Sequence, residues 1–300
     1  MRHNQSNGPK RIAGRAPGKR ARPFGGPVCI ALVGQGLAQH SLAVLHAVEA
    51  QALGFDLQID HLDPEAMVRA RPSLAQMLDM LEIAGFAGAN IASPYKRAAL
   101  AHVDELSPSA RATGAVTTIL FRDGVRLGHN TTAWAFRESL RRSLGQRAPG
   151  DVLVLGAGPS GAAAAHALRD LGTGRLLIHD PVPDRAEALA LDCNGIVADD
   201  PARVAEQVHG IVNACPVGGP KRPGLPIAAG ALLDDHWVAD MLEDPFDTAL
   251  LQAARDRGSM VISGVGLAVF RLMRDFHLMT GMAPDVRRLR GQVEERRRAG

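Results

Sequence analysis

A glycine-rich segment, residues 152–180, most constrains what this chain can fold into. Four apolar residues, Val152–Leu155, lead into the run Gly156–Gly161 (GAGPSG), and an alanine-rich stretch follows to Leu171. A second apolar run, Leu176–Ile178, ends at Asp180. The alternation of apolar runs, glycines and a helix-forming stretch predicts a strand, a tight turn, a helix and a second strand.

Each glycine of this run has a different physical task. Gly156 can adopt the turn conformation, Gly158 lets a pyrophosphate approach the backbone, and Gly161 lets helix and strand pack closely. The helix N-terminus offers free N–H groups and the positive end of a dipole. The sequence predicts a dinucleotide site here, and a glycine turn without cofactor is the alternative. Its residues are Gly156, Ala157, Gly158, Pro159, Ser160 and Gly161.

Asp180 indicates which dinucleotide is bound. A carboxylate at the end of the second strand accepts hydrogen bonds from both ribose hydroxyls and repels a 2′-phosphate. The residues that follow, Pro181 and Val182, offer no arginine for such a phosphate. The sequence therefore predicts NAD rather than NADP, and the alternative for Asp180 is a helix cap.

Composition describes an ordinary globular chain of one large or two medium domains. The 300 residues are 46% hydrophobic and 22% charged. The three cysteines are odd in number and far apart, which predicts no disulfide framework and a cytoplasmic location. No apolar run approaches the ~18 residues of a membrane span.

The net charge of +3 conceals a basic arm and a slightly acidic body. Residues 1–22 hold seven Lys and Arg and no acid, so the remainder has 27 basic and 31 acidic residues, a net charge of −4. We expect residues 1–24 to be disordered, and nothing in the body predicts nucleic-acid or membrane binding. The histidines are scattered without metal-ligand spacing, so we expect no metal site.

Strand and helix patterns alternate along the rest of the chain, which predicts an α/β fold. We expect Ser41 to cap a helix that reaches Leu53, and Asp123-Gly124 to turn a hairpin. The expected strands are Val28–Val33, Gly54–Ile59, the hairpin Ile119–Gly128, Gly210–Ala214, Trp237–Met241 and Met260–Ser263. The expected helices are Leu42–Leu53, Leu74–Ala84, Lys96–His102, Trp134–Leu144 and Leu267–Met279.

Six segments in register, between about residues 28 and 290, resemble the shikimate dehydrogenase family. They are GFAGANIASPYK, ATGAVTTI, GHNTTAWAF, IVNACPVGG, GLPI with WVADMLEDPFDTALLQAARDRG, and GVGLAVFRLMRDFHLMTG. The resemblance implies an N-terminal α/β substrate domain at 25–128 and a Rossmann NAD-binding domain at 129–264. It implies that the C-terminal helix, within 265–300, returns to the substrate domain.

The resemblance also implies the site residues, and the chain departs from the family at most substrate positions. The family's Ser-x-Ser pair is Ser41 and Ala43 here, and the catalytic Asp of its N-T-D motif is Thr132. The other altered substrate positions are Ala92, Thr117, Glu243 and Arg271. Lys96, the family's catalytic lysine, is retained with Thr132 beside it. Cys215, Pro216, Met241 and Gly264 are implied to lie along the cofactor.

Lys96 is a suitable proton donor for reduction of a ketone, and a base for the reverse reaction, when burial or a cation lowers its pKa. Arg271, if it points into the pocket, lowers that pKa further and can grip a carboxylate. Glu243 can pair with Arg271 or Lys96. The alternatives are a solvated lysine, a surface arginine and a loop carboxylate, and Cys215 is expected to be a small buried residue rather than a nucleophile.

These features predict an NAD-dependent dehydrogenase that transfers a hydride to or from a small hydroxylated, carboxylated substrate other than shikimate. Two alternatives stay open: a non-catalytic NAD-binding regulatory homologue, and a shikimate or quinate dehydrogenase proper. We expect a monomer or a homodimer whose partner is a small molecule.

Overall fold

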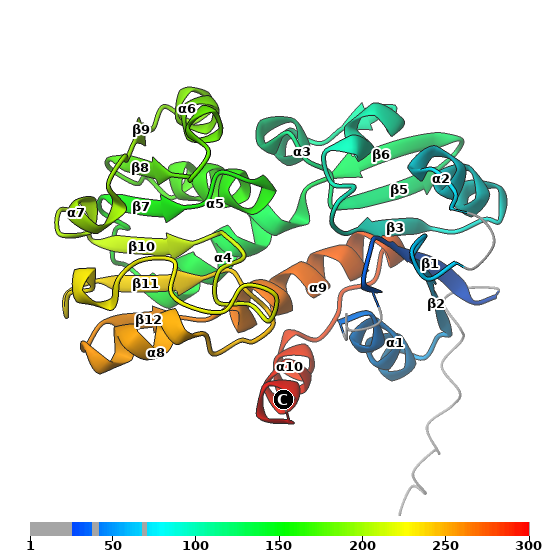
Figure 1. Cartoon of the computed structure of the whole chain (residues 1–300). Helices are drawn as coiled ribbons and strands as arrows, with labels where there is room; N and C mark the ends of the chain where they lie inside the picture. The colour runs from blue at the N-terminus through cyan, green and yellow to red at the C-terminus, as the bar shows by residue number, and fades with distance from the viewer. Residues whose placement is uncertain (1–25, 38–41, 68–70, 300) are drawn as a thin grey trace, which may run out of the picture.

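The computed structural model describes residues 26–37, 42–67 and 71–299 and contains two six-stranded sheets (Figure 1). The predicted basic arm, residues 1–24, and the predicted cap Ser41 lie outside the described residues. Along the described chain, no helix is both long and apolar enough to cross a membrane.

The first sheet has the order β2-β1-β3-β5-β6-β4. β1 pairs in parallel with β2 and β3, whereas β5 is antiparallel to both β3 and β6. The predicted Asp123-Gly124 hairpin is present, with positive φ at both residues. The strands are β1 Val28–Val33, β2 Leu57–Leu62, β3 Gly88–Ile91, β4 Glu105–Leu106, β5 Thr118–Arg122 and β6 Val125–His129.

Short helices cover this sheet. α2 begins at a capping box in which Ser73 and Gln76 bond reciprocally, and it buries Met77 and Leu78 completely against the sheet. The helices of this part are α1 Leu42–Leu53, α2 Leu74–Ile83, the 3₁₀ helix η2 Ala98–His102 and α3 Pro108–Thr113.

The second sheet is entirely parallel, with the order β12-β11-β10-β7-β8-β9. Its connections reverse direction between β7 and β10, and ligands of open α/β sheets bind beyond the strand ends at such a point. The strands are β7 Val152–Leu155, β8 Leu176–His179, β9 Ile196–Val197, β10 Gly210–Asn213, β11 Trp237–Asp240 and β12 Met260–Ile262. The accompanying helices are α5 Pro159–Asp170, α6 Pro183–Asp192, α7 Pro201–Ala205, η3 Ala229–Ala231 and α8 Ala249–Asp256.

Two long helices connect the parts. α4, Thr131–Leu144, leads from β6 to β7, and α9, Gly264–Thr280, leads from β12 back to the first sheet. They pack along each other between the two sheets (Figure 1). The predicted fold class is therefore confirmed: two α/β parts, one with a Rossmann sheet, and a late helix that returns to the first part.

The chain end forms a second C-terminal helix, α10 Val286–Ala299, in addition to the single closing helix that the sequence predicted. Leu289 and Val293 are buried against α9 and α1. The buried Glu49 of α1 accepts hydrogen bonds from Arg288 Nε at 2.7 Å, Arg288 Nη2 at 2.8 Å and the Asp285 N–H at 2.7 Å. The arginine-rich tail is thus anchored by one ion pair and an apolar stripe.

Four predicted boundaries were wrong, each for a local reason. The strand expected at Gly54–Ile59 begins at Leu57, because Gly54 turns the chain with φ +86°. The helix expected from Lys96 is a turn followed by η2. α4 begins before Trp134 because Asn130 caps it, and α9 begins at Gly264 rather than Leu267.

Candidate active site

Lys96 lies in the turn that follows β3, a strand inside the first sheet between β1 and β5. Its carbonyl oxygen accepts a hydrogen bond from the Val116 N–H at 2.8 Å, which ties the turn to the segment before β5. The side chain is half-buried, and no carboxylate in the described part of the chain lies within ion-pair distance of it. Lys96 is therefore not a fully solvent-exposed lysine.

Arg271 and Glu243 form an ion pair near Lys96. Arg271 Nη2 lies 2.6 Å from Glu243 Oε2, and the two side chains are 26% and 17% exposed. Arg271 comes from α9, whereas Glu243 comes from the loop after β11. Of the pairings that the sequence left open, the structure therefore shows Glu243 with Arg271.

Asp275 is a fourth charged residue of this cluster, and the sequence analysis missed it. It lies one helical turn after Arg271 on α9, is 5% exposed, and accepts a hydrogen bond from Thr118 Oγ1 at 2.6 Å. The available signal was periodicity: Asp275 shares a helix face with the buried Leu272 and Phe276. A carboxylate on an apolar helix face indicates a buried polar site.

The pKa values of these groups follow from burial and from one another. Burial, and then the charge of Arg271, lower the pKa of Lys96 to about 8, while Glu243 and Asp275 oppose that change. Burial raises the pKa of Glu243, against the effects of Arg271 and Lys96. Burial raises the pKa of Asp275 to about 6, although Thr118 and Arg271 stabilise its charged form.

A group of threonines surrounds the start of α4. Thr117 Oγ1 lies 3.1 Å from Thr131 Oγ1 and accepts a hydrogen bond from the Thr131 N–H at 2.8 Å. Thr132 Oγ1 is buried and has no hydrogen-bond partner among the described residues. A buried hydroxyl without a partner is costly, which makes Thr132 a candidate contact for a bound molecule.

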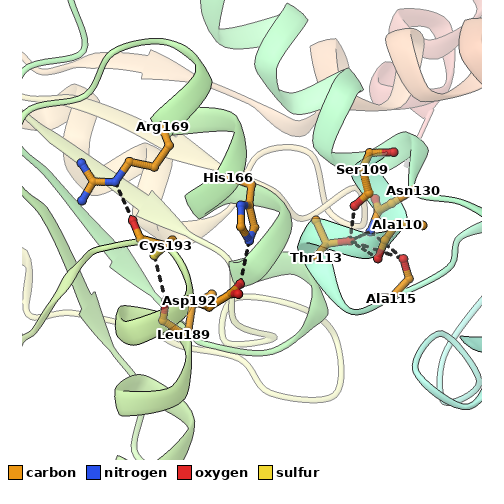
Figure 2. A network of polar contacts seen from close by, with 10 residues as sticks. All are labelled: Ser109, Ala110, Thr113, Ala115, Asn130, His166, Arg169, Leu189, Asp192 and Cys193. Carbon is orange, nitrogen blue, oxygen red and sulfur yellow. Dashed lines mark hydrogen bonds and ion pairs between the residues drawn. The ribbon is translucent and has the colours of Figure 1, made fainter. Parts of the chain in front are cut away.

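Asn130 fixes the position of these threonines. Its Nδ2 donates to Thr113 Oγ1 at 2.7 Å and to the Ala115 carbonyl at 3.2 Å (Figure 2). Its Oδ1 caps α4 by accepting the Ala133 N–H at 3.2 Å. The start of α4 is thereby held against α3.

Ala92 and Ala43 are the remaining predicted substrate positions that the structure describes. Ala92 follows β3 and is half-buried, and Ala43 lies in the first turn of α1. His46, further along α1, is buried with both ring nitrogens unpartnered in the described structure, and its ring meets the Phe276 ring edge-on at 5.9 Å. Burial lowers the pKa of His46 to about 4, so the imidazole is neutral at pH 7.

The glycine loop beyond β7 is shaped by close contacts at two of its glycines. Gly156 has φ +106°, and a Cβ there would lie 2.9 Å from the Cys215 Cβ. A Cβ on Gly161 would overlap the Gly156 carbonyl oxygen, whereas a Cβ on Gly158 would meet nothing within 4 Å. The loop is thus closely packed on one side and open at the N-terminus of α5, where a pyrophosphate fits.

Asp180 lies directly beside this loop. Its Oδ2 accepts the Ala157 N–H at 2.8 Å and its Oδ1 accepts the Val182 N–H at 2.9 Å. The carboxylate therefore joins the ends of β7 and β8, and each oxygen keeps a lone pair for a ribose hydroxyl.

The other end of α5 is fixed to the segment after α6. Arg169 Nε donates to the Cys193 carbonyl at 2.8 Å, and His166 Nε2 lies 2.9 Å from Asp192 Oδ2 (Figure 2). The helix that begins at the glycine loop is therefore held at its far end.

The loops after β10 and β11 are joined by a buried pair. Asn213 Nδ2 donates to Asp240 at 3.1 Å, and Asp240 also accepts from Thr248 Oγ1 at 2.7 Å. Burial raises the pKa of the Cys215 thiol, which disfavours a thiolate nucleophile. The loops position the remaining predicted cofactor residues, Cys215, Pro216, the buried Met241, and Gly264, where a Cβ would overlap the Leu242 carbonyl. Within 26–37, 42–67 and 71–299, no group of His, Cys, Asp and Glu can hold a metal.

Sequence comparison identifies relatives over most of the chain. The family model described as the shikimate dehydrogenase substrate binding domain matches residues 32–119. A shikimate dehydrogenase (NADP(+)) of Streptomyces avermitilis is 35% identical over 275 residues, 89% of this chain and 94% of the relative. A quinate/shikimate dehydrogenase (NAD(+)) of Corynebacterium glutamicum is 35% identical over 273 residues, 88% of this chain and 96% of the relative.

Solved structures similar to this chain belong to the same family as these sequence relatives. Quinate dehydrogenase from Corynebacterium glutamicum in complex with NAD superposes with a TM-score of 0.84 at 34% identity, covering 90% of this chain and 99% of that one. Shikimate 5-dehydrogenase from Thermus thermophilus in complex with NADP(H) and shikimate gives a TM-score of 0.80 at 31% identity, covering 89% and 99%. The chain belongs to the shikimate dehydrogenase family, whose matched members are oxidoreductases that use NAD(+) or NADP(+).

Proposed function

We propose that this protein is an NAD-dependent dehydrogenase acting on a small hydroxylated and carboxylated substrate other than shikimate. The observation that carries the proposal is Lys96, a half-buried amine with a pKa lowered to about 8, beside the Arg271–Glu243 pair. A group that gains and loses a proton near neutral pH is suited to general acid–base work.

NAD is proposed as the cofactor because of Asp180. The glycine loop and the N-terminus of α5 would hold the pyrophosphate, and the Asp180 carboxylate would bind the ribose hydroxyls and disfavour a 2′-phosphate. The Corynebacterium glutamicum relative whose structure contains NAD supports the same choice. When bound, NAD⁺ would accept the hydride in oxidation and NADH would supply it in reduction.

The chain's own residues would handle the proton and the substrate. In oxidation, the neutral Lys96 amine takes the proton of the substrate hydroxyl; in reduction, the ammonium returns it to the carbonyl oxygen. Glu243 engages Nη2 of Arg271, and a guanidinium has five N–H donors, so the remaining ones can bind a substrate carboxylate. Thr132 Oγ1 offers a hydrogen bond to a hydroxyl.

The pocket supports a substrate unlike shikimate. Ala43 and Ala92 replace polar residues of the family pattern, and Thr117 and Thr132 replace an amide and a carboxylate. Thr117 is engaged with Thr131 rather than free. A substrate hydroxyl left against a methyl group costs about 1–3 kcal/mol.

A panel of hydroxy acids, polyols and cyclitols, scanned for NAD reduction by absorbance, tests the function directly. Turnover of one compound with NAD supports the proposal. A protein that binds NAD tightly and oxidises no compound of the panel would instead be the regulatory homologue.

We expect oxidation to depend on pH through Lys96. Because the neutral amine is the base, kcat/KM for oxidation rises as pH increases through about 8, whereas reduction, which needs the ammonium, falls over the same range. Steady-state rates in both directions from pH 6 to pH 10 measure this. Profiles of the two directions that do not diverge near pH 8 would contradict the assignment.

We expect NAD to bind at least about tenfold more tightly than NADP, a difference of about 1.4 kcal/mol. Asp180→Ala removes the repulsion of the 2′-phosphate and should narrow this gap, and calorimetric titration of both cofactors measures it. Asp184→Ala, an exposed acid in the first turn of α6, is the control that leaves the gap unchanged. Equal affinities in the unmodified protein would refute the preference.

We also propose a domain organisation, an oligomeric state and a cellular location for the protein. We place the substrate domain at 25–128, the Rossmann domain at 129–264 and the returning C-terminal segment at 265–300, in a monomer or homodimer. All three cysteines are free, which supports a reducing compartment and hence the cytoplasm.

A further inference from the structure

Four charged side chains meet where the first sheet, α9 and the loop after β11 come together. Two are cations, Lys96 and Arg271, and two are carboxylates, Glu243 and Asp275. Each influences the ionisation of Lys96, and they come from three separate segments.

The contacts divide these charges into two unequal pairs. Glu243 and Arg271 are in direct contact at 2.6 Å, so their charges largely neutralise each other. Asp275 is hydrogen-bonded by hydroxyls: Thr118 Oγ1 donates to it at 2.6 Å, and Thr131, together with the charge of Arg271, also stabilises its charged form. Neutral donors solvate a carboxylate without cancelling its charge, and Arg271 is already in contact with Glu243, so the charge of Asp275 still favours the protonated form of Lys96.

We propose that Asp275 is a positioning residue for Lys96, its buried carboxylate supplying the counter-charge that keeps the half-buried amine able to carry a proton. Without the charge of Asp275, Glu243 would be the one carboxylate opposing the effect of Arg271 on the pKa of Lys96, and Glu243 is already paired with Arg271. The amine would then lose its proton too readily to protonate a carbonyl at neutral pH. This inference rests on the proposed acid–base role of Lys96.

Thr118 extends the device to the first sheet. It lies in β5, so its hydroxyl fixes the Asp275 carboxylate relative to the first sheet, beside the strand that precedes Lys96. Asn90 Nδ2 donates to the same hydroxyl at 3.3 Å, and β3, which contains Asn90, leads to Lys96. The carboxylate and the lysine are therefore positioned by neighbouring strands of one sheet.

The test is a direct titration of Lys96 in the full-length protein, which requires no substrate. The chain has four lysines, Lys10, Lys19, Lys96 and Lys221. Reductive methylation with ¹³C-formaldehyde gives each an NMR signal that reports its protonation, and Lys96→Arg identifies the Lys96 signal. Arg271, Glu243 and Asp275 are the charged groups that face it, and all but the substituted one are retained in each variant.

In Asp275→Asn, which keeps the shape and an oxygen for Thr118, the pKa of Lys96 should fall below its value of about 8 in the unmodified protein. Asp247→Asn, an exposed carboxylate paired with Arg255, is the matched control and should leave it unchanged. Thr118→Val should shift the titration in the same direction as Asp275→Asn, while Thr118→Ser, which keeps the hydroxyl, should restore it. The Thr118 pair decides the question if Asp275→Asn does not fold.

A Lys96 titration that is the same in Asp275→Asn, Thr118→Val and the unmodified protein would overturn the inference. That result is distinguishable from failure of the proposed function, which is absence of turnover with every compound of the panel. Where a substrate is found, the basic limb of kcat/KM for reduction should move to lower pH in Asp275→Asn by the same amount as the titration.

Discussion

Lys96→Ala is expected to lower kcat for the true substrate by ~10²–10⁴-fold, the usual loss when one acid–base group is removed. NAD affinity should be unchanged, because the glycine loop and Asp180 belong to the second sheet and Lys96 does not contact them. Steady-state kinetics and calorimetric NAD titration measure the two effects separately.

Two further variants show whether the loss is one of proton transfer. Lys96→Arg keeps the charge but cannot release a proton near neutral pH, so it should be nearly as inactive as Lys96→Ala. Arg97→Ala removes the exposed cation next in the chain and should retain full activity. Unaltered turnover in Lys96→Ala would make the lysine a bystander and favour a regulatory role.

Shikimate and quinate are expected to be poor substrates, with kcat/KM reduced by about 30-fold to about 10⁴-fold relative to a family member that uses them. At Ala43 and Ala92 the resemblance implies polar substrate contacts that these methyl groups cannot make. Each unpaired hydroxyl or carboxylate costs about 1–3 kcal/mol, and two such losses give this range. Turnover with NAD across a wide pH range measures it, with the Corynebacterium glutamicum quinate/shikimate dehydrogenase as positive control.

Thr132→Asp alone should recover little of this activity, because the other substrate positions stay altered. Shikimate oxidation by the unmodified protein at a rate constant of ~1–10³ s⁻¹ and modest substrate concentration would show that the pocket accepts it after all.

The sequence pattern was sufficient to predict those elements that are determined by residues close together in the chain. The strand, glycine turn, helix and strand of 152–180 occur as β7, α5 and β8, and the Asp-Gly pair turns the predicted hairpin. In both cases the constraint is a backbone conformation that few residues can adopt. The start of β2 depends on the turn at Gly54, and the start of α4 depends on its cap Asn130; the apolar pattern alone indicates neither boundary.

The charged cluster required the tertiary structure. Arg271 and Glu243 are separated by a strand and a helix in the chain, and either could have faced solvent. Asp275 contacts Thr118, from which it is separated by 157 positions, so no local window joins them. The helical periodicity of α9 was the only signal that Asp275 lies on a buried face. Its partner Thr118 could be identified only once the position of β5 was known.

The anchoring of α10 on α1 has a consequence for how the protein is made. Glu49 is buried in an ion pair with Arg288, which is synthesised 239 residues later. A buried carboxylate that lacks its partner costs about 3–5 kcal/mol, much of the stability of an ordinary domain. The N-terminal part therefore completes its structure only after α10 has been synthesised. The first and last helices of the described fold are thereby coupled, so that folding of the N-terminal part depends on a segment that follows the glycine-loop part in the chain.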